Sequence, residues 1–136
     1  AVDLVKPNHH ELSELVGRTL KTIEDVIGAA REVIAGGVET ILCSMGADGA
    51  LLITAEGATH CEPIEKVSGT PVGAGDILLG IFIAAGGDVT ALEKAIAWSA
   101  ASVPLPGTSI PSPAQAGAVT VRTRDDFDRA RVLVEA

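Results

Sequence analysis

Short apolar runs alternate along this chain with longer segments in which apolar residues recur at helical spacing. The runs predict strands at residues 3–5, 38–44, 50–54, 59–62 and 119–122. The periodic segments predict helices after residue 8, over 22–35, after the GAGD sequence, over 90–102 and from residue 125. Asn8 with Glu11, and Thr90 with Glu93, have the spacing of capping boxes at two of these helix starts. Alternating strands and helices, with hairpin material between some strands, favour an α/β fold with a mixed sheet.

Composition limits the partners and the compartment of the chain. Its 136 residues suit one compact domain, and only 2% are aromatic against 47% hydrophobic, so the core must be aliphatic. A formal net charge of −8 argues against a nucleic-acid partner. No apolar run reaches about 18 residues and the first residues carry no basic segment, so neither a membrane span nor a signal peptide is expected. The two cysteines, Cys43 and Cys61, do not have CxxC spacing. We therefore expect both to be buried free thiols in a cytoplasmic protein.

The sequence GTPVGAGD, residues 69–76, joins a glycine turn to an apolar run. The backbone N–H groups of Gly73, Ala74 and Gly75 would converge at a helix start, where free donors and the helix dipole favour an anion. Asp76 would then accept the proton of a substrate hydroxyl while those N–H groups hold the phosphoryl group under attack. The alternative is that Asp76 only caps the helix and the glycines only make a turn. Taken alone, the four residues favour this alternative.

A second glycine turn, SMGADG, closes the predicted strand at 38–44. Its members are Ser44, Met45, Gly46, Ala47, Asp48 and Gly49. Backbone N–H groups in such a turn can approach a ligand closely. A plain β-hairpin explains the same residues and is favoured when they are taken alone.

A third motif, KPNHHE, lies at residues 6–11. It places Asn8 and Glu11 one helical turn apart on the same face. Oxygen ligands at that spacing suit Mg²⁺, either directly or through its waters. An ordinary capping box is the alternative interpretation.

Taken in order, the three motifs resemble the C-terminal half of the ribokinase-like (PfkB) family of sugar kinases. The resemblance extends over essentially the whole chain and rests on DLVKPNHHELSELVG, SMGADGALLITAEG, VGAGD and AWSAASVPLPGTSIPSP. It implies a ribokinase-like three-layer α/β/α, Rossmann-like core with a mixed, mostly parallel sheet that is truncated at its N-terminal side. It also implies an ATP-dependent phosphotransferase with ATP and Mg²⁺ as cofactors and a sugar phosphate as the other substrate.

Carried over residue by residue, the resemblance implies a catalytic role for the GAGD sequence. Asp76 matches the family's catalytic base, and Gly73, Ala74 and Gly75 match its anion hole, with Gly75 and Asp76 also at the nucleotide. The sequence departs from the family at the next position, where Ile77 replaces a small polar residue or alanine. That departure leaves the expected role of Asp76 unchanged.

The other two motifs match the family's nucleotide and metal sites. Residues 44–49 match the nucleotide-binding turn, and residues 100–107 would lie near the adenine. Asn8 and Glu11 match the family's magnesium-associated pair. All of these assignments come from the resemblance.

Family members are considerably longer than this chain, and the half that carries most of their sugar-binding groups is absent from these residues. The resemblance therefore implies one domain over residues 1–136 that supplies the nucleotide and catalytic elements. The strand at residues 3–5 begins the chain without a neighbour before it, and such a strand usually pairs with another. A homodimer, or pairing with the missing N-terminal half, is the expected consequence.

Overall fold

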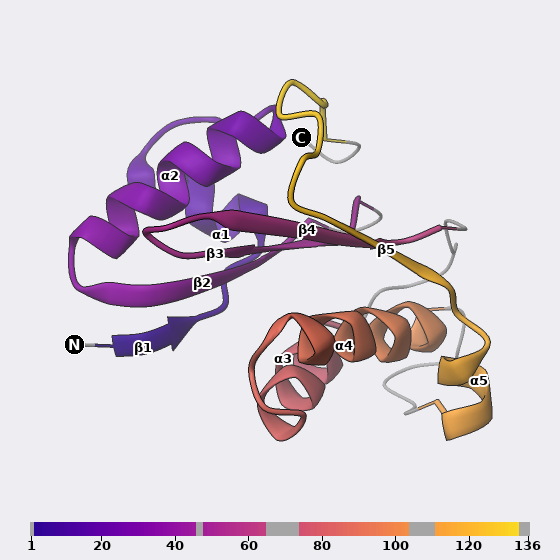
Figure 1. Cartoon of the computed structure of the whole chain (residues 1–136). Helices are drawn as coiled ribbons and strands as arrows, with labels where there is room; N and C mark the ends of the chain where they lie inside the picture. Colours follow the sequence, from indigo (N-terminus) through magenta and orange to yellow (C-terminus); the bar gives the residue numbers. More distant parts are fainter. Residues whose placement is uncertain (1, 46–47, 65–73, 104–110, 134–136) are drawn as a thin grey trace. The chain divides into compact units, whose positions relative to one another are not determined.

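The computed structural model describes residues 2–45, 48–64, 74–103 and 111–133 (Figure 1). Its elements in chain order are β1 (Val2–Val5), α1 (His9–Val16), α2 (Ile23–Ala35), β2 (Val38–Ser44), β3 (Ala50–Ile53), β4 (Ala58–Pro63), α3 (Ala74–Ala84), α4 (Val89–Ser102), α5 (Pro113–Gly117) and β5 (Val121–Arg124). The chain divides into two compact units, a first unit of residues 1–60 and 124–136 and a second unit of residues 61–123. One domain over all 136 residues stays a prediction.

The strands form an open mixed sheet in the order β1-β2-β3-β4-β5. β1 and β2 pair in parallel, with Val5 opposite Ile41, whereas β2 and β3 pair antiparallel, with Ile41 opposite Ile53. A parallel pair needs a long crossover, which α1 and α2 supply between β1 and β2. The antiparallel pair needs only the turn at residues 45–49. The predicted α/β fold with a mixed sheet is confirmed.

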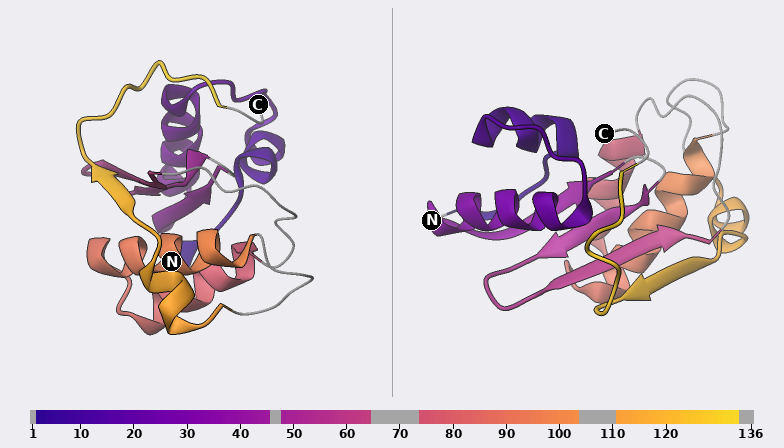
Figure 2. Two further views of the ribbon diagram at one scale, coloured as in Figure 1. Left: turned by 90° about the vertical axis from the view of Figure 1, so that its right-hand side faces the viewer. Right: turned by 90° about the horizontal axis from the view of Figure 1, so that it is seen from above.

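In the first unit, α1 and α2 cover one face of the strands β1–β3 (Figure 2). Helix α2 forms because apolar residues recur at helical spacing after its N-cap Thr22, and Val26 and Ile27 are at most 1% exposed. Its apolar side packs with strand residues into one aliphatic core. The buried members of that core are Leu12, Leu20, Ile23, Val26, Ile27, Ala29, Ala30, Ile41, Cys43, Met45, Leu51, Ile53 and Leu133.

In the second unit, α3 and α4 pack against each other and are joined by a tight turn. Gly86 and Gly87 make this turn with φ values of 109° and 71°, a region that favours glycine. Phe82 and Leu92 are almost fully buried. Ala91 and Ala95, two small side chains of α4, are buried as well.

The segment that follows β5 corrects one prediction. A last helix from residue 125 was expected, with its acids near the helix start, but residues 125–133, which we call the tail, form no helix. Instead, the carbonyl oxygens of Arg131 and Arg129 accept hydrogen bonds from the backbone N–H groups of Ile23 (3.1 Å) and Glu24 (2.8 Å). The first N–H groups of a helix have no partner within that helix. The tail supplies partners at the start of α2, and this tertiary pairing replaces local helix formation.

The start of α4 is a second correction. Thr90 and Glu93 were expected to cap this helix, but its N-cap is Asp88, which accepts a hydrogen bond from the N–H of Ala91 at 2.8 Å. The helix therefore begins before the predicted box, at Val89. The carboxylate of Glu93 accepts a hydrogen bond from another element of the second unit.

Both cysteines are buried, as the composition predicts. Burial raises the pKa of Cys43 to about 12 and that of Cys61 to about 11. Both thiols therefore hold their protons at neutral pH and are poor nucleophiles. Within the described ranges, the helices lack the length and apolarity needed to cross a membrane.

Candidate nucleotide and catalytic site

The first candidate element is the start of α1. Asn8 is the N-cap, and its Oδ1 accepts a hydrogen bond from the N–H of Glu11 at 2.8 Å. The carboxylate of Glu11 accepts one from the N–H of Asn8 at 2.9 Å, which completes a capping box. Glu11 is exposed. The box fixes two oxygen-bearing side chains next to each other, and hard cations such as Mg²⁺ prefer oxygen ligands. The donor set of this helix start therefore fits the predicted magnesium pair.

The second candidate element is the turn between β2 and β3. The N–H of Met45 donates to the carbonyl of Gly49 at 2.8 Å, and the N–H of Asp48 donates to the carbonyl of Met45 at 3.1 Å. Gly49 has φ 86°, a conformation that side chains disfavour. Gly46 and Ala47 lie outside the described residues. The predicted hairpin turn is present, and its nucleotide-binding role stays a prediction.

These two elements lie side by side. Asn8 and Ser44 form a parallel β-bridge, and the N–H of Ser44 donates to the carbonyl of Pro7 at 3.1 Å. The reason is topological, because β1 and β2 are parallel and both end here. In open α/β sheets, ligands bind outside the carboxyl ends of the strands. The fold therefore brings two motifs that are far apart in sequence to the place where such a ligand would bind.

Asp48 has surroundings that sequence reasoning missed. It is fully buried, and its Oδ1 accepts a hydrogen bond from Arg131 Nη2 at 2.7 Å. Its carbonyl oxygen lies 2.7 Å from Nε2 of His60 on β4. Aspartate is an ordinary turn residue, so nothing in the sequence indicated that Asp48 would be buried or that Arg131 would pair with it.

The third candidate element is the GAGD sequence in the second unit. α3 begins at Ala74, so Gly75 and Asp76 lie in its first turn, as expected of a helix that starts within this motif. Gly73 and the side chain of Asp76 lie outside what the structure describes. The anion hole and the catalytic base therefore stay predictions. Of the segment expected near the adenine, residues 100–103 are described and end α4.

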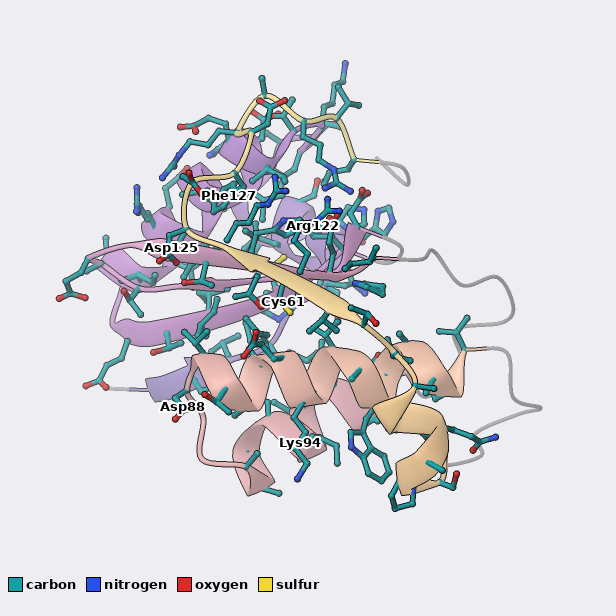
Figure 3. The ribbon with its side chains drawn as sticks, turned by 45° about the vertical axis from the view of Figure 1, so that its right-hand side comes forward. Cys61, Asp88, Lys94, Arg122, Asp125 and Phe127 are labelled. Carbon is teal, nitrogen blue, oxygen red and sulfur yellow. The ribbon has the colours of Figure 1, made fainter. Side chains whose placement is uncertain are left out.

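Polar contacts elsewhere in the second unit hold its elements together. Thr123 on β5 donates a hydrogen bond to Glu93 of α4 at 2.8 Å, and its hydroxyl lies 3.5 Å from the sulfur of Cys61 on β4. Arg122 and Glu62 form an ion pair at 3.8 Å, and Figure 3 shows Arg122 on β5. The carboxylate of Glu93 therefore pairs with β5 and takes no part in the cap of α4, which Asp88 supplies. Among the described residues, no three His, Cys, Asp or Glu side chains gather as a metal-binding group.

Comparison with known proteins identifies the family. The family model for pfkB carbohydrate kinases matches residues 1–115. The chain belongs to this family. It is 40% identical over 130 residues to 1-phosphofructokinase of Rhodobacter capsulatus, a match that covers 89% of this chain and 41% of that protein. The match to 1-phosphofructokinase of Haloferax volcanii is 37% over 110 residues and covers 78% of this chain and 36% of the relative.

Solved structures agree with this family assignment. Phosphofructokinase-2 from Escherichia coli, in complex with potassium, has a TM-score of 0.76 and 31% identity, with 86% of this chain and 40% of that chain covered. Ribokinase from Thermotoga maritima has a TM-score of 0.73 and 26% identity, with 85% and 41% covered. The fold is therefore the ribokinase-like α/β fold of the family. The chain spans well under half the length of these pfkB relatives.

Proposed function

We propose that this chain is the C-terminal, nucleotide-binding and catalytic portion of an ATP-dependent kinase that phosphorylates the 6-hydroxyl of fructose 1-phosphate. The observation that carries the kinase proposal is the bridge between Asn8 and Ser44, which puts the metal-associated pair beside the glycine turn. The names of the curated relatives support fructose 1-phosphate as the substrate. The sugar-binding groups would come from a separate N-terminal portion.

In this proposal, ATP lies along the backbone of the turn at residues 44–49. The N–H groups of Ser44, Met45 and Asp48 are bonded within the protein and fix the shape of this turn. Asn8 and Glu11 hold Mg²⁺ directly or through its waters. When bound, the ion supplies positive charge that neutralises the phosphate oxygens. The capping box keeps both side chains in place before any ligand arrives, which lowers the entropy cost of binding.

The chemical step uses the start of α3. The oxygen of the sugar 6-hydroxyl attacks the γ-phosphorus, the bond to the β-phosphate oxygen breaks, and ADP leaves. Asp76 takes the proton of the hydroxyl as general base. Backbone N–H groups at residues 73–75, together with the positive end of the α3 dipole, stabilise the charge on the transferred group. Without sugar-binding groups to orient the hydroxyl, the 136-residue chain alone should show no turnover above background.

The nucleotide role is tested by Mg·ATP titration of the chain with Glu11→Gln, and with Asp25→Asn as the matched control. Both residues are the third-position members of capping boxes, at α1 and α2. Glutamine still caps, but it is a weaker ligand for Mg²⁺ than a carboxylate. We expect Glu11→Gln to weaken Mg·ATP binding by about tenfold or more and Asp25→Asn to leave it unchanged. Wild-type chain that binds no Mg·ATP would contradict the proposal.

The substrate is tested in an assembled enzyme, which we define as this chain combined with the N-terminal portion of a 1-phosphofructokinase relative. Sugar-dependent ADP release is measured with fructose 1-phosphate, fructose 6-phosphate and tagatose 6-phosphate. The proposal expects the highest kcat/KM with fructose 1-phosphate. A preference for tagatose 6-phosphate would support the kinase activity but contradict fructose 1-phosphate as the substrate. Mg·ATP binding with no turnover of any sugar would instead favour a nucleotide-binding module.

A further inference from the structure

The turn at residues 45–49 contains a carboxylate that is closed off from solvent. Asp48 is 0% exposed, and its neighbours Met45 and Ala50 are equally buried. A buried charge is costly unless it is paired and hydrogen-bonded. The guanidinium of Arg131 meets this need at 2.7 Å, and the Arg131 side chain is itself 30% exposed. A side chain placed in this way contributes to the shape of the turn and is shielded from a ligand.

A second contact holds the same residue from the sheet. The carbonyl oxygen of Asp48 lies 2.7 Å from Nε2 of His60, whose ring is 3% exposed. The ring of Phe127 in the tail meets that of His60 edge-on, with centroids 5.8 Å apart. Figure 3 shows Phe127 and Asp125 along the tail. Asp125 accepts a hydrogen bond from the hydroxyl of Thr59 on β4 at 2.8 Å.

The tail that carries Arg131 is itself fixed in position. Its backbone accepts hydrogen bonds from the start of α2, at the carbonyls of Arg129 and Arg131, and the N–H of Leu133 donates to the carbonyl of Lys21 at 2.8 Å. The backbone on both sides of Arg131 is therefore tied to the start of α2 and to Lys21 just before it. The guanidinium can reach Asp48 without ordering a free chain end, which removes much of the entropy cost of the ion pair.

We propose that Arg131 is a positioning residue for the nucleotide-binding turn, and that Asp48 acts through Arg131 rather than by contact with the nucleotide. This inference rests on the proposed function. The pair holds Met45, Asp48 and Gly49 in the conformation that their hydrogen bonds within the turn define, and this conformation shapes the surface along which the nucleotide lies. The tail, far from this turn in sequence, thereby becomes a determinant of nucleotide affinity.

The first test needs no nucleotide. Amide hydrogen exchange is measured on the 136-residue chain at Met45 and Asp48, whose N–H groups donate within the turn. We expect Arg131→Gln to speed exchange at both amides by about tenfold or more, because it removes the positive charge that lies 2.7 Å from a buried carboxylate. The matched control is Arg129→Gln in the same tail, because that side chain is 43% exposed and lies 3.5 Å from Glu24. Arg129→Gln should leave both exchange rates unchanged.

The second test titrates the same variants with Mg·ATP. Arg131→Gln should raise Kd about tenfold, and Asp48→Asn combined with it should add little, because residues in contact are not additive. Arg131→Lys keeps the charge without the planar fork and should recover part of both effects; it is also the test variant if Arg131→Gln does not fold. Normal exchange and normal Kd in a folded variant would overturn the role of Arg131 alone. Absence of Mg·ATP binding by the wild-type chain would instead overturn the proposed function and this inference with it.

Discussion

The helices α1 and α2 both begin with a capping box, but the surroundings of the two boxes differ. In α2 the hydrogen bonds of Thr22 and Asp25 are part-buried, and carbonyl groups of Arg129 and Arg131 accept further hydrogen bonds from the same helix start. In α1 the box is exposed, and Glu11 stands where two parallel strands end. The same local motif is thus covered by the tail in one helix and open to solvent in the other.

This difference in exposure distinguishes a capping box that only stabilises its helix from one whose side chains a ligand can also reach. The backbone N–H groups of Lys21 and Thr22 donate to the carboxylate of Asp25 and hold its pKa below the ordinary value. The carboxylate of Asp25 therefore serves to stabilise the start of α2. A box at the carboxyl ends of β1 and β2 also fixes a helix start, but it does so beside the turn at residues 44–49. Position in the sheet, rather than the motif itself, makes Asn8 and Glu11 candidates for a metal.

The largest expected effect tests whether the start of α3, unlike those of α1 and α2, carries a catalytic residue. In the assembled enzyme, Asp76→Asn keeps a side-chain oxygen for capping but cannot accept a proton at neutral pH. Loss of a general base costs about 10²–10⁴ in rate. We expect kcat to fall by that much while the affinity for Mg·ATP stays nearly constant.

The control for this variant is Asp88→Asn, at the N-cap of α4. Asparagine caps a helix about as well as aspartate, so stability and turnover should both stay close to wild type. If Asp76→Asn also has normal turnover in a folded enzyme, its carboxylate is only a cap and the proposed mechanism is wrong.

A smaller effect tests how much the buried side of α2 contributes to the free energy of unfolding. Ile27 is 1% exposed, so Ile27→Ala should lower the free energy of unfolding by about 2–5 kcal/mol through lost burial and an unfilled cavity. Leu15 on α1 is 65% exposed, and Leu15→Ala should change that free energy by no more than about 0.5 kcal/mol. Urea unfolding of both variants measures the difference. Equal losses would contradict the burial of α2.

The two cysteines extend the comparison to the two units, with Cys43 in the first and Cys61 in the second. Below pH 9 both thiols are protonated in the folded and the unfolded chain, so ionisation of the thiols does not reduce the free energy of unfolding. Above pH 9 the unfolded chain ionises first, because burial raises the folded pKa of Cys43 to about 12. Each thiol then costs up to about 1.4 kcal/mol per pH unit.

The measurement is urea unfolding between pH 8 and 12 for wild type, Cys43→Ala and Cys61→Ala. The loss of stability with rising pH should be less steep in each variant. Cys43→Ala should show it over the wider pH range, since the pKa of Cys61 rises only to about 11. Slopes identical to wild type in both variants would show that these thiols are not protected by burial.

Local signals were sufficient to predict several elements of the fold. Strand β2 has the predicted bounds, and α2 follows Thr22 and ends at Ala35, because apolar spacing, cap and stop all lie within the segment itself. Helix α5 was not predicted, although Ser112, Pro113 and Gln115 form the capping box of a short helix and were visible in the sequence.

The remaining features depend on residues far apart in the chain. The tail contains acids that favour a helix start, but its carbonyl groups pair with α2 at the other end of the sequence. The pair of Asp48 and Arg131 joins residues 83 positions apart. Neither contact produces a periodic pattern in the sequence. Local propensity therefore cannot predict either of them. The candidate site was predictable only as three separate motifs, and the structure adds that two of them adjoin.

The smallest effect gives the most direct comparison of the two capping boxes. Thr22→Ala and Asn8→Ala each remove the N-cap oxygen of a box, and each should lower the free energy of unfolding by about 1 kcal/mol. Stability alone therefore does not distinguish the two helix starts. Mg·ATP titration does, because Asn8 lies beside the turn at residues 44–49 and Thr22 is covered by the tail. Only Asn8→Ala should weaken binding beyond what its loss of stability explains. Equal affinities in the two variants would mean that the box of α1, like that of α2, serves the fold alone.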